Sequence, residues 1–185
     1  MLDRIILAPY YLALKIRHFC YDHGIRKVHT CEVPTICVGN ITAGGTGKTP
    51  HTEMILRELL QSERWAGQPV AVLSRGYRRR SKGFRLLPIE ASASLYGDEP
   101  AQIKHKFPAV AVAVDKDRVQ GCAALAPDCG IILLDDAYQY RKLQADMNIV
   151  LSCYDRPVAS DALLPFGRLR DLKSRLYDAD VVIVS

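Results

Sequence analysis

The stretch TICVGNITAGGTGKT, Thr35–Thr49, decides the fold that this sequence predicts. Its apolar start, Thr35–Val38, is typical of a buried strand, and a helical pattern runs from Lys48 to Gln61 after the glycine-rich turn. Glycines allow backbone N–H groups to curl around phosphates without clashes from Cβ atoms. The positive end of the following helix adds to the attraction for anions. The stretch therefore predicts a phosphate-binding loop that holds a nucleoside triphosphate.

The residues around the turn supply the chemistry of such a P-loop. We expect Lys48 to reach the β- and γ-phosphates of ATP and the Thr49 hydroxyl to ligate Mg²⁺. The strict pattern G-x-x-x-x-G-K-[ST] has glycine where this chain has Thr42, but the strand–loop–helix context and Gly44-Gly45 compensate. The expected nucleotide-binding residues are Thr42, Ala43, Gly44, Gly45, Thr46, Gly47, Lys48 and Thr49.

From Val33 onward, short apolar runs alternate with helical stretches. The predicted strands are Thr35–Val38, Val70–Leu73, Ala109–Val114, Ile131–Leu134, Ile149–Leu151 and Val181–Val184. The predicted helices between them are Lys48–Gln61, Glu99–Lys106 and Lys116–Leu125. Most of the strands are continuously apolar, as in a parallel sheet buried on both faces. We therefore expect an α/β fold of the P-loop NTPase type, with a doubly wound, mostly parallel sheet that binds ligands at the carboxyl ends of its strands.

A pair of acids ends one of these strands. Asp135 and Asp136 directly follow the apolar run Ile131–Leu134, which is the form of a Walker B strand. In P-loop enzymes an acid at this position faces the phosphate loop and holds the magnesium shell. Asp135 and Asp136 are therefore expected metal-shell residues together with Thr49, although paired aspartates can also mark a simple turn.

The first segment, from Met1 to about Gly24, has the pattern of an amphipathic helix. Its uncharged part, Ile5–Leu14, is ten residues long and too short to span a bilayer. Basic side chains flank that part, and the segment carries four aromatic residues, as in helices that lie in a membrane interface: Tyr10, Tyr11, Phe19 and Tyr21. The alternative is a helix that packs on the core of its own domain.

Composition and charge narrow the function classes. The chain has 185 residues, 49% of them hydrophobic and 24% charged, which suits a globular domain with or without an appendage. Its six cysteines form no C-x-x-C pair, so we expect reduced thiols and neither a disulfide framework nor a zinc site. The net charge of +5 includes a basic cluster at Arg75–Arg85, which suits a phosphorylated partner, an anionic surface or plain solvation.

Three further motifs are weak singly: Gly97-Asp98-Glu99-Pro100, Asp115-Lys116-Asp117-Arg118 and Leu163–Asp171. Their order and spacing, taken together with the P-loop and the paired acids, resemble the tetraacyldisaccharide 4′-kinase family, the lipid A 4′-kinases of Gram-negative bacteria. The matching pieces are VPTICVGNITAGGTGKTP, VLSRGY, GDEP, DKDR, LLDDAYQYR and LLPFGRLRD. They are spread over essentially the whole chain from Val33 to its end.

The resemblance implies an activity and roles for named residues. It implies transfer of the γ-phosphate of ATP to the 4′-hydroxyl of tetraacyldisaccharide 1-phosphate, with ATP and Mg²⁺ as cofactors. Asp98 matches the proposed catalytic base, and Lys48 and Arg118 are the other expected catalytic residues. Glu99, Arg170 and Asp171 match positions near the substrate. A phosphoryl transfer of this kind needs mainly positioning and charge neutralisation.

The resemblance also implies an organisation for the chain. Residues 1–28 correspond to a membrane-interface helix and residues 29–185 to the N-terminal kinase lobe, peripheral on the cytoplasmic face of the inner membrane, with no nucleic acid as partner. The family continues into a second lobe, so this chain is expected to be an N-terminal fragment. Tyr140 stands where the family usually has histidine. Another P-loop ATPase, or an ATP-binding but inactive membrane-surface fragment, remains an alternative; the chain has no Asn-Lys-x-Asp motif of a GTPase.

Overall fold

A computed structural model describes residues 2–65 and 67–185 of the chain. Its helices are α1 (Leu2–Asp22), α2 (Lys48–Gln61), α3 (Ala93–Tyr96), α4 (Asp98–Lys106) and α5 (Arg118–Leu125). Its strands are β1 (Thr35–Asn40), β2 (Val70–Ser74), β3 (Arg85–Leu86), β4 (Ala111–Val114), β5 (Ile131–Asp135), β6 (Met147–Ser152) and β7 (Val181–Val184). Short 3-10 turns follow α2, α5 and β6 and precede β7, the last of them being η4 (Lys173–Asp178).

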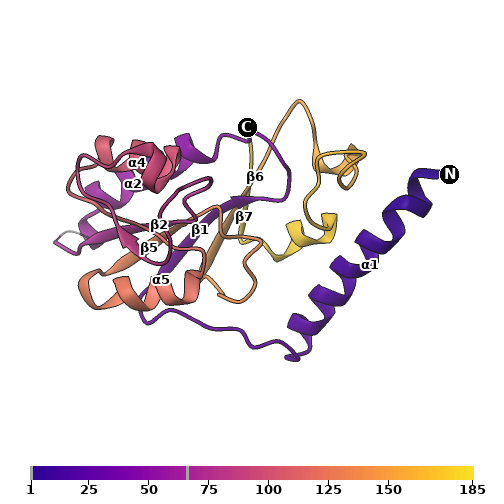
Figure 1. Ribbon diagram of the computed structural model, residues 1–185, viewed down its shortest axis with the longest axis horizontal. Coiled ribbons are helices and arrows are strands. Elements are labelled where there is room, and N and C mark those ends of the chain that lie inside the picture. Colours follow the sequence, from indigo (N-terminus) through magenta and orange to yellow (C-terminus); the bar gives the residue numbers. More distant parts are fainter. Residues whose placement is uncertain (1, 66) are drawn as a thin grey trace.

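The strands form one sheet in the order β3-β4-β2-β5-β1-β6-β7. All neighbours pair in parallel except the two-residue strand β3, which pairs antiparallel with β4. Helices α2 and α4 cover one face of the sheet and α5 lies on the other, as Figure 1 shows. This is the doubly wound, mostly parallel α/β fold that the alternating pattern predicts.

The core has two layers because successive strand residues point to opposite faces of the sheet. Cys37, Leu73 and Leu134 belong to the cluster on the α5 side, whereas Val38, Val72 and Leu133 belong to the cluster on the α2 and α4 side. Both layers are closed by apolar helix residues, and the central strands are buried along their whole length. The continuous apolar runs in the sequence therefore reflect burial on both faces.

The structure differs from the sequence-based prediction mainly at element ends. Strand β4 starts at Ala111 and not at Ala109, because Val110 N–H donates to the Phe107 carbonyl in a turn. Helix α5 starts at Arg118, because the Asp117 carboxylate accepts hydrogen bonds from Val119 N–H and Gln120 N–H and caps the helix. The short elements α3 and β3 were not predicted, since neither is long enough to show a period in the sequence.

Helix α1 lies beside the sheet domain and is reached by a long connection before β1 (Figure 1). Two stripes run along it. Leu14 and His18, one turn apart, are buried against the domain, whereas Leu12, Ile16 and Phe19 are exposed. The helix therefore packs on its own domain with one face and leaves an apolar face uncovered in the structure.

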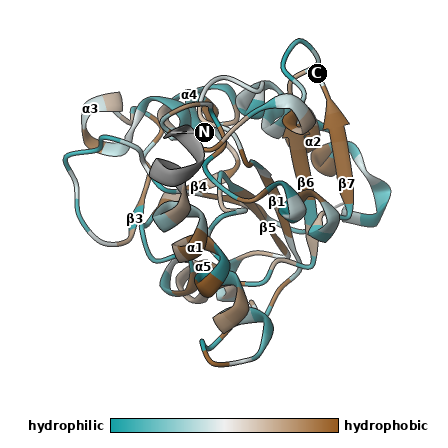
Figure 2. Cartoon of the chain, turned by 90° about the vertical axis from the view of Figure 1, so that its right-hand side faces the viewer, coloured by the Kyte–Doolittle hydropathy of each residue, from teal (hydrophilic) through white to brown (hydrophobic). Residues whose placement is uncertain are grey.

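Strand β7 forms one edge of the sheet. In the part of the chain that the structure describes, it pairs only with β6, in parallel, from Ile149↔Val181 to Ser152↔Val184. Val181, Val182 and Val184 are exposed, and Figure 2 shows β7 as a hydrophobic, brown strand at the side of the molecule. Within the described residues no strand covers its outer edge.

Gly39 is where the phosphate loop's strand meets the segment after β5. A Cβ atom added at Gly39 would lie 2.5 Å from Cβ of the buried Tyr138. We expect Gly39→Ala to lower the free energy of unfolding by about 1–3 kcal/mol, because a packed core resists an added methyl group. Urea titration checks this. Gly45→Ala is the matched control, since nothing lies within 4 Å of its added Cβ; an equal loss in both variants would contradict the packing argument.

Candidate nucleotide and acceptor site

The phosphate loop is held in shape by its own residues. It leaves β1 at Asn40 and ends at Gly47, which has φ 71° and is the N-cap of α2. Non-glycine residues rarely adopt this left-handed conformation, so Gly47 is required for the turn into the helix. Asn40 Nδ2 donates to Thr46 Oγ1 at 2.6 Å across the loop. The loop therefore presents a rigid backbone at the helix N-terminus, the usual place for phosphate.

A cavity of about 450 Å³ opens at the carboxyl ends of β1, β2 and β5. It is lined by Ala43, Gly44, Ser74, Arg75, Tyr77, Asp98, Glu99, Pro100, Asp136 and Arg170. The structure thus brings together six of the predicted site residues, which come from the phosphate loop, the start of α4, the end of β5 and the segment before η4. Its position agrees with the rule that ligands of doubly wound sheets bind at the carboxyl ends of strands.

Asp136 is the charged centre of this cavity. Its backbone has φ 49°, which is uncommon for a residue with a side chain, and its N–H donates to the Val38 carbonyl at 2.9 Å. Asp136 Oδ1 lies 3.7 Å from Lys48 Nζ and 3.2 Å from a guanidinium nitrogen of Arg170. One carboxylate therefore gathers the P-loop lysine and the arginine at the same point.

Asp135, the residue before Asp136 at the end of β5, is only 2% exposed. Its Oδ2 accepts a hydrogen bond from Ser74 Oγ at 2.9 Å. Burial, together with the nearby charges of Glu99 and Asp136, raises the pKa of Asp135 to about 6. The buried position of Asp135 therefore disfavours its charged form.

Asp98 and Glu99 begin α4 and face the cavity. Gly97 takes the N-cap position, so the Asp98 carboxylate is not used as a cap. Neither carboxylate has a hydrogen bond or ion pair to the described residues. Asp98 is therefore available to accept a proton from a group that enters the cavity.

Two of the predicted catalytic and substrate residues, Arg118 and Asp171, make their contacts away from the cavity. The Arg118 side chain is buried and donates to the backbone carbonyls of Asp115 and Asp135. The Asp171 carboxylate points away from the cavity and lies 2.5 Å from His18 Nε2 of α1. The structure therefore does not bring either side chain into the cavity that Asp98 and Arg170 line.

The other loop residues surround the phosphate position. Thr42 and Thr46 are buried, and together with Gly45 they line a small hollow of about 30 Å³ on another side of the loop. Thr49 lies in the first turn of α2, half-buried. Its hydroxyl has no hydrogen bond to the described residues.

Tyr140, at the position where the resemblance implies histidine, lies away from the cavity. Its hydroxyl donates to Asp117 Oδ1 at 2.9 Å, and burial together with Asp117 raises its pKa to about 12. The pKa of Asp117 is lowered to about 2 by hydrogen bonds from Lys142 and Tyr140. Tyr140 thus supports the cap of α5 as a neutral donor.

Sequence reasoning missed several lining residues: Ser74, Arg75, Tyr77 and Pro100. The first three belong to the segment VLSRGY at the end of β2, which pairs with β5 in parallel. Two adjacent parallel strands end at the same edge of a sheet, so a polar residue at the end of β2 has to lie near Asp135. The sequence does not show the order of the strands, so it could not predict that the end of β2 lies near Asp135.

The donor set fits Mg²⁺ with a nucleotide. Within residues 2–65 and 67–185 no cluster of three or more His, Cys, Asp or Glu side chains is placed to hold a metal ion. Mg²⁺ commonly takes only one or two carboxylates and completes its shell with phosphate oxygens and water. Asp135 and Asp136 at the end of β5 and Thr49 in the first turn of α2 carry oxygen atoms of the kind that Mg²⁺ prefers.

Comparisons with known proteins agree with this geometry. The family model described as tetraacyldisaccharide-1-P 4′-kinase, LpxK, matches residues 4–185. The chain belongs to the tetraacyldisaccharide 4′-kinase family. The tetraacyldisaccharide 4′-kinase of Phocaeicola vulgatus is 47% identical over 175 residues, which are 92% of this chain and 46% of that relative. That of Flavobacterium johnsoniae is 44% identical over 98% of this chain and 54% of its own length.

A solved structure of the same kinase family has the same fold. The crystal structure of LpxK from Aquifex aeolicus in complex with ATP matches the whole chain with a TM-score of 0.84 and 34% identity, over 59% of that protein. The chain spans about half the length of the curated tetraacyldisaccharide 4′-kinases that it matches.

The raised pKa of Asp135 makes stability depend on pH. Because the folded pKa is about 6 and an unfolded aspartate titrates at about 4, the folded state binds the extra proton in this window. The stability of the parent that depends on protonated Asp135 is fully present below about pH 4 and is lost as pH rises through about 6. We therefore expect the stability gain of Asp135→Asn over the parent to be small below about pH 4 and to rise to on the order of 2 kcal/mol above about pH 6.

Urea unfolding of both proteins at a series of pH values, without nucleotide or metal, measures this gain. Asp128→Asn, an exchange of an exposed aspartate far from the cavity, controls for the loss of one negative charge. A gain that stays constant with pH would show that burial of Asp135 does not disfavour its charged form.

Proposed function

We propose that this chain carries the nucleotide half of a tetraacyldisaccharide 4′-kinase, which transfers the γ-phosphate of ATP to the 4′-hydroxyl of tetraacyldisaccharide 1-phosphate. The observation that carries the proposal is the cavity that joins the phosphate loop, Asp98 and Asp136. The ATP complex of the Aquifex aeolicus relative supports ATP as the nucleotide. Residues 29–185 are the kinase lobe and residues 1–28 its membrane-facing segment.

The phosphates of ATP lie on the loop from Thr42 to Thr49. Backbone N–H groups and the start of α2 hold them, and Lys48 neutralises the β- and γ-phosphates. Arg170 enters the same cavity from the other side of Asp136. A lysine and an arginine on either side of the γ-phosphate stabilise the charge that spreads over its oxygens during transfer.

Asp98 is the base in this proposal. The 4′-hydroxyl oxygen attacks the γ-phosphorus, the bond to the β-phosphate oxygen breaks, ADP leaves, and the hydroxyl proton passes to the Asp98 carboxylate. Asp98 suits this role because it lines the cavity and no described residue occupies its oxygens. Glu99 lies beside it and orients the acceptor.

Mg²⁺ fits as the metal of this site. Asp135, Asp136 and Thr49 would hold it, and when bound it would neutralise charge on the β- and γ-phosphates. The position of Asp135 and Asp136 at the end of β5, beside the strand that leads into the phosphate loop, supports this assignment. Arg118 supports Asp135 from behind through the backbone carbonyl that accepts its hydrogen bond.

Helix α1 brings the cavity to the lipid acceptor. Its exposed stripe, Leu12, Ile16 and Phe19, lies next to Lys15, so the outward face is apolar with a basic edge. Such a face enters the headgroup region of an anionic membrane while the helix lies in its plane. Among the described residues no helix combines the length and apolar character needed to cross a bilayer. The exposed stripe of α1 and the family resemblance support peripheral attachment to the cytoplasmic face of the inner membrane, which we propose for this chain.

Exchange of Lys48 and of Asp98 separates binding from transfer. We expect Lys48→Ala to weaken MgATP binding by about a hundredfold, because the phosphates lose a partly buried cation. Asp98→Asn is expected to bind MgATP as the parent does and to lose transfer by about a hundredfold or more, because it lacks the base. Calorimetric titration and transfer from γ-labelled ATP to tetraacyldisaccharide 1-phosphate in detergent micelles measure the two effects.

Lys27→Ala, which removes an exposed lysine from the connection after α1, is the control for lost positive charge. Unchanged MgATP affinity in Lys48→Ala would refute the phosphate loop assignment. Retained transfer in Asp98→Asn would show that another group takes the proton. For transfer, the parent protein is assayed both as this chain and as a full-length member of the family.

A charge on the outward stripe of α1 tests the membrane proposal. We expect Ile16→Glu to reduce binding to anionic liposomes by about tenfold, because a carboxylate replaces an apolar side chain in the headgroup region. Ile89→Glu places the same change at another exposed isoleucine, away from α1, and is expected to bind as the parent does. Liposome flotation measures both. Equal losses in the two variants would mean that net charge, and not α1, governs the attachment.

A further inference from the structure

The segment Arg168–Asp171 lies between the phosphate loop and α1. On the loop side, the Ala43 N–H donates to the Arg168 carbonyl at 2.6 Å, and the Arg170 N–H donates to the Ile41 carbonyl at 2.8 Å. Thr42 and Leu169 form an antiparallel bridge between these two bonds. The first part of the phosphate loop is therefore held in place by this segment, which continues the pairing of the chain beyond the end of β1.

On its other side the same segment is held by α1. The Tyr10 hydroxyl donates to the Arg170 carbonyl at 3.0 Å. One residue further on, Asp171 Oδ1 lies 2.5 Å from His18 Nε2, with Asp171 0% and His18 6% exposed. Although burial disfavours a charged carboxylate, the hydrogen bonds from His18 and from the Leu172 N–H lower the pKa of Asp171 overall. Loss of the imidazole would leave a buried carboxylate without its main partner, which is costly.

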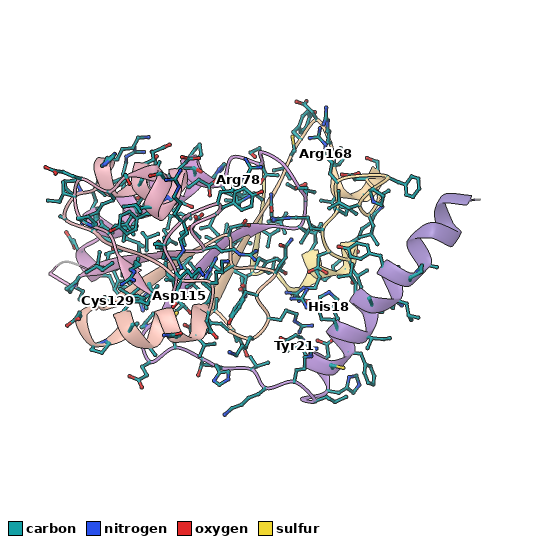
Figure 3. All side chains as sticks on the ribbon, viewed as in Figure 1. His18, Tyr21, Arg78, Asp115, Cys129 and Arg168 are labelled. Carbon is teal, nitrogen blue, oxygen red and sulfur yellow. The ribbon has the colours of Figure 1, made fainter. Side chains whose placement is uncertain are left out.

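His18 is itself oriented by a second contact. Arg141 donates to His18 Nδ1 at 3.0 Å, so the proton of the neutral imidazole lies on Nε2 and points to Asp171. Arg141 also pairs with Asp22 at 2.7 Å, near the end of α1. Figure 3 shows His18 on the side of α1 that faces the rest of the chain, with Tyr21 close by on the same helix. The imidazole is thus held from both sides.

Arg170 and Asp171 are adjacent but serve opposite sides of the segment. The Arg170 guanidinium donates to Asn40 Oδ1 and to Asp136 Oδ1, within the cavity, whereas the Asp171 carboxylate binds α1. We propose that His18 and Asp171 are positioning residues: their buried pair fixes the segment Arg168–Asp171 and so sets Arg170 and the phosphate loop for MgATP. The inference rests on the proposed function, because it concerns the affinity of that same site.

A merely structural role is the competing explanation. The pair could only hold α1 against the domain, with no effect on the cavity beyond general stability. The two explanations differ in one respect: a positioning role requires the effect on nucleotide to pass through Arg170. A double-mutant cycle measures that dependence directly.

The experiment is calorimetric titration of the 185-residue chain with MgATP, after circular dichroism has shown that each variant is folded. We expect His18→Ala to weaken MgATP binding by about fivefold, and to add less than about twofold once Arg170 is already Ala. His18→Gln, which keeps an N–H donor for Asp171, is expected to recover most of the affinity. Asp22→Asn breaks the ion pair to Arg141 without contacting Arg168–Asp171 and is expected to bind as the parent does.

The inference would be overturned by parent-like affinity in His18→Ala, or by losses that simply multiply in the double variant. An equal loss in Asp22→Asn would also overturn it, because general loosening of α1 would then suffice. If His18→Ala fails to fold, the MgATP affinities of His18→Gln and Asp171→Asn are compared with Arg170 present and with Arg170→Ala. A greater loss in Asp171→Asn than in His18→Gln that disappears in the Arg170→Ala background supports the inference. Equal losses, or losses that multiply, overturn it. Failure of the proposed function appears elsewhere, as unchanged MgATP affinity in Lys48→Ala.

Discussion

The parallel pairing of β1 with β5 is the constraint on which the site depends. Its register places Val38 opposite Asp135, so the strand that enters the phosphate loop runs beside the strand that ends in two acids. The next residue, Asp136, closes this arrangement with a backbone hydrogen bond to Val38. A shift of one residue in this register would turn the buried face of β5 outward and move both carboxylates away from the loop.

The strand pattern made most of the fold predictable. Continuous apolar runs identified the six long strands, and Gly47-Lys48-Thr49 identified the turn into α2, because these features depend on neighbours in the sequence. The two-residue strand β3 left no such pattern. Among the site residues, those at strand ends and at the start of α4 meet in the cavity as expected, because their positions follow from the sheet.

Long-range partners could not be predicted in this way. Asp171 is 153 residues away from His18, and nothing in the local sequence distinguishes a carboxylate that faces a sugar from one that faces a helix. Arg118 follows a strand at its carboxyl end, where arginines often contact phosphate, yet its guanidinium binds backbone carbonyls. Of the two alternatives for α1, the packed face is seen at Leu14 and His18, whereas a membrane role for the exposed apolar stripe remains a proposal.

The exposed edge at β7 has a consequence for handling the protein in solution. An edge strand with free N–H and C=O groups can accept a strand from another molecule, and Val181, Val182 and Val184 give this edge high β-propensity without any charge. Natural edges usually carry a lysine, a proline or a bulge that blocks such addition. Asp180, immediately before β7, is the nearest charged residue, and its carboxylate accepts a hydrogen bond from the Asn148 N–H. Concentrated preparations of this chain are thus prone to associate edge to edge, and a lysine in place of Val182 would act as a gatekeeper.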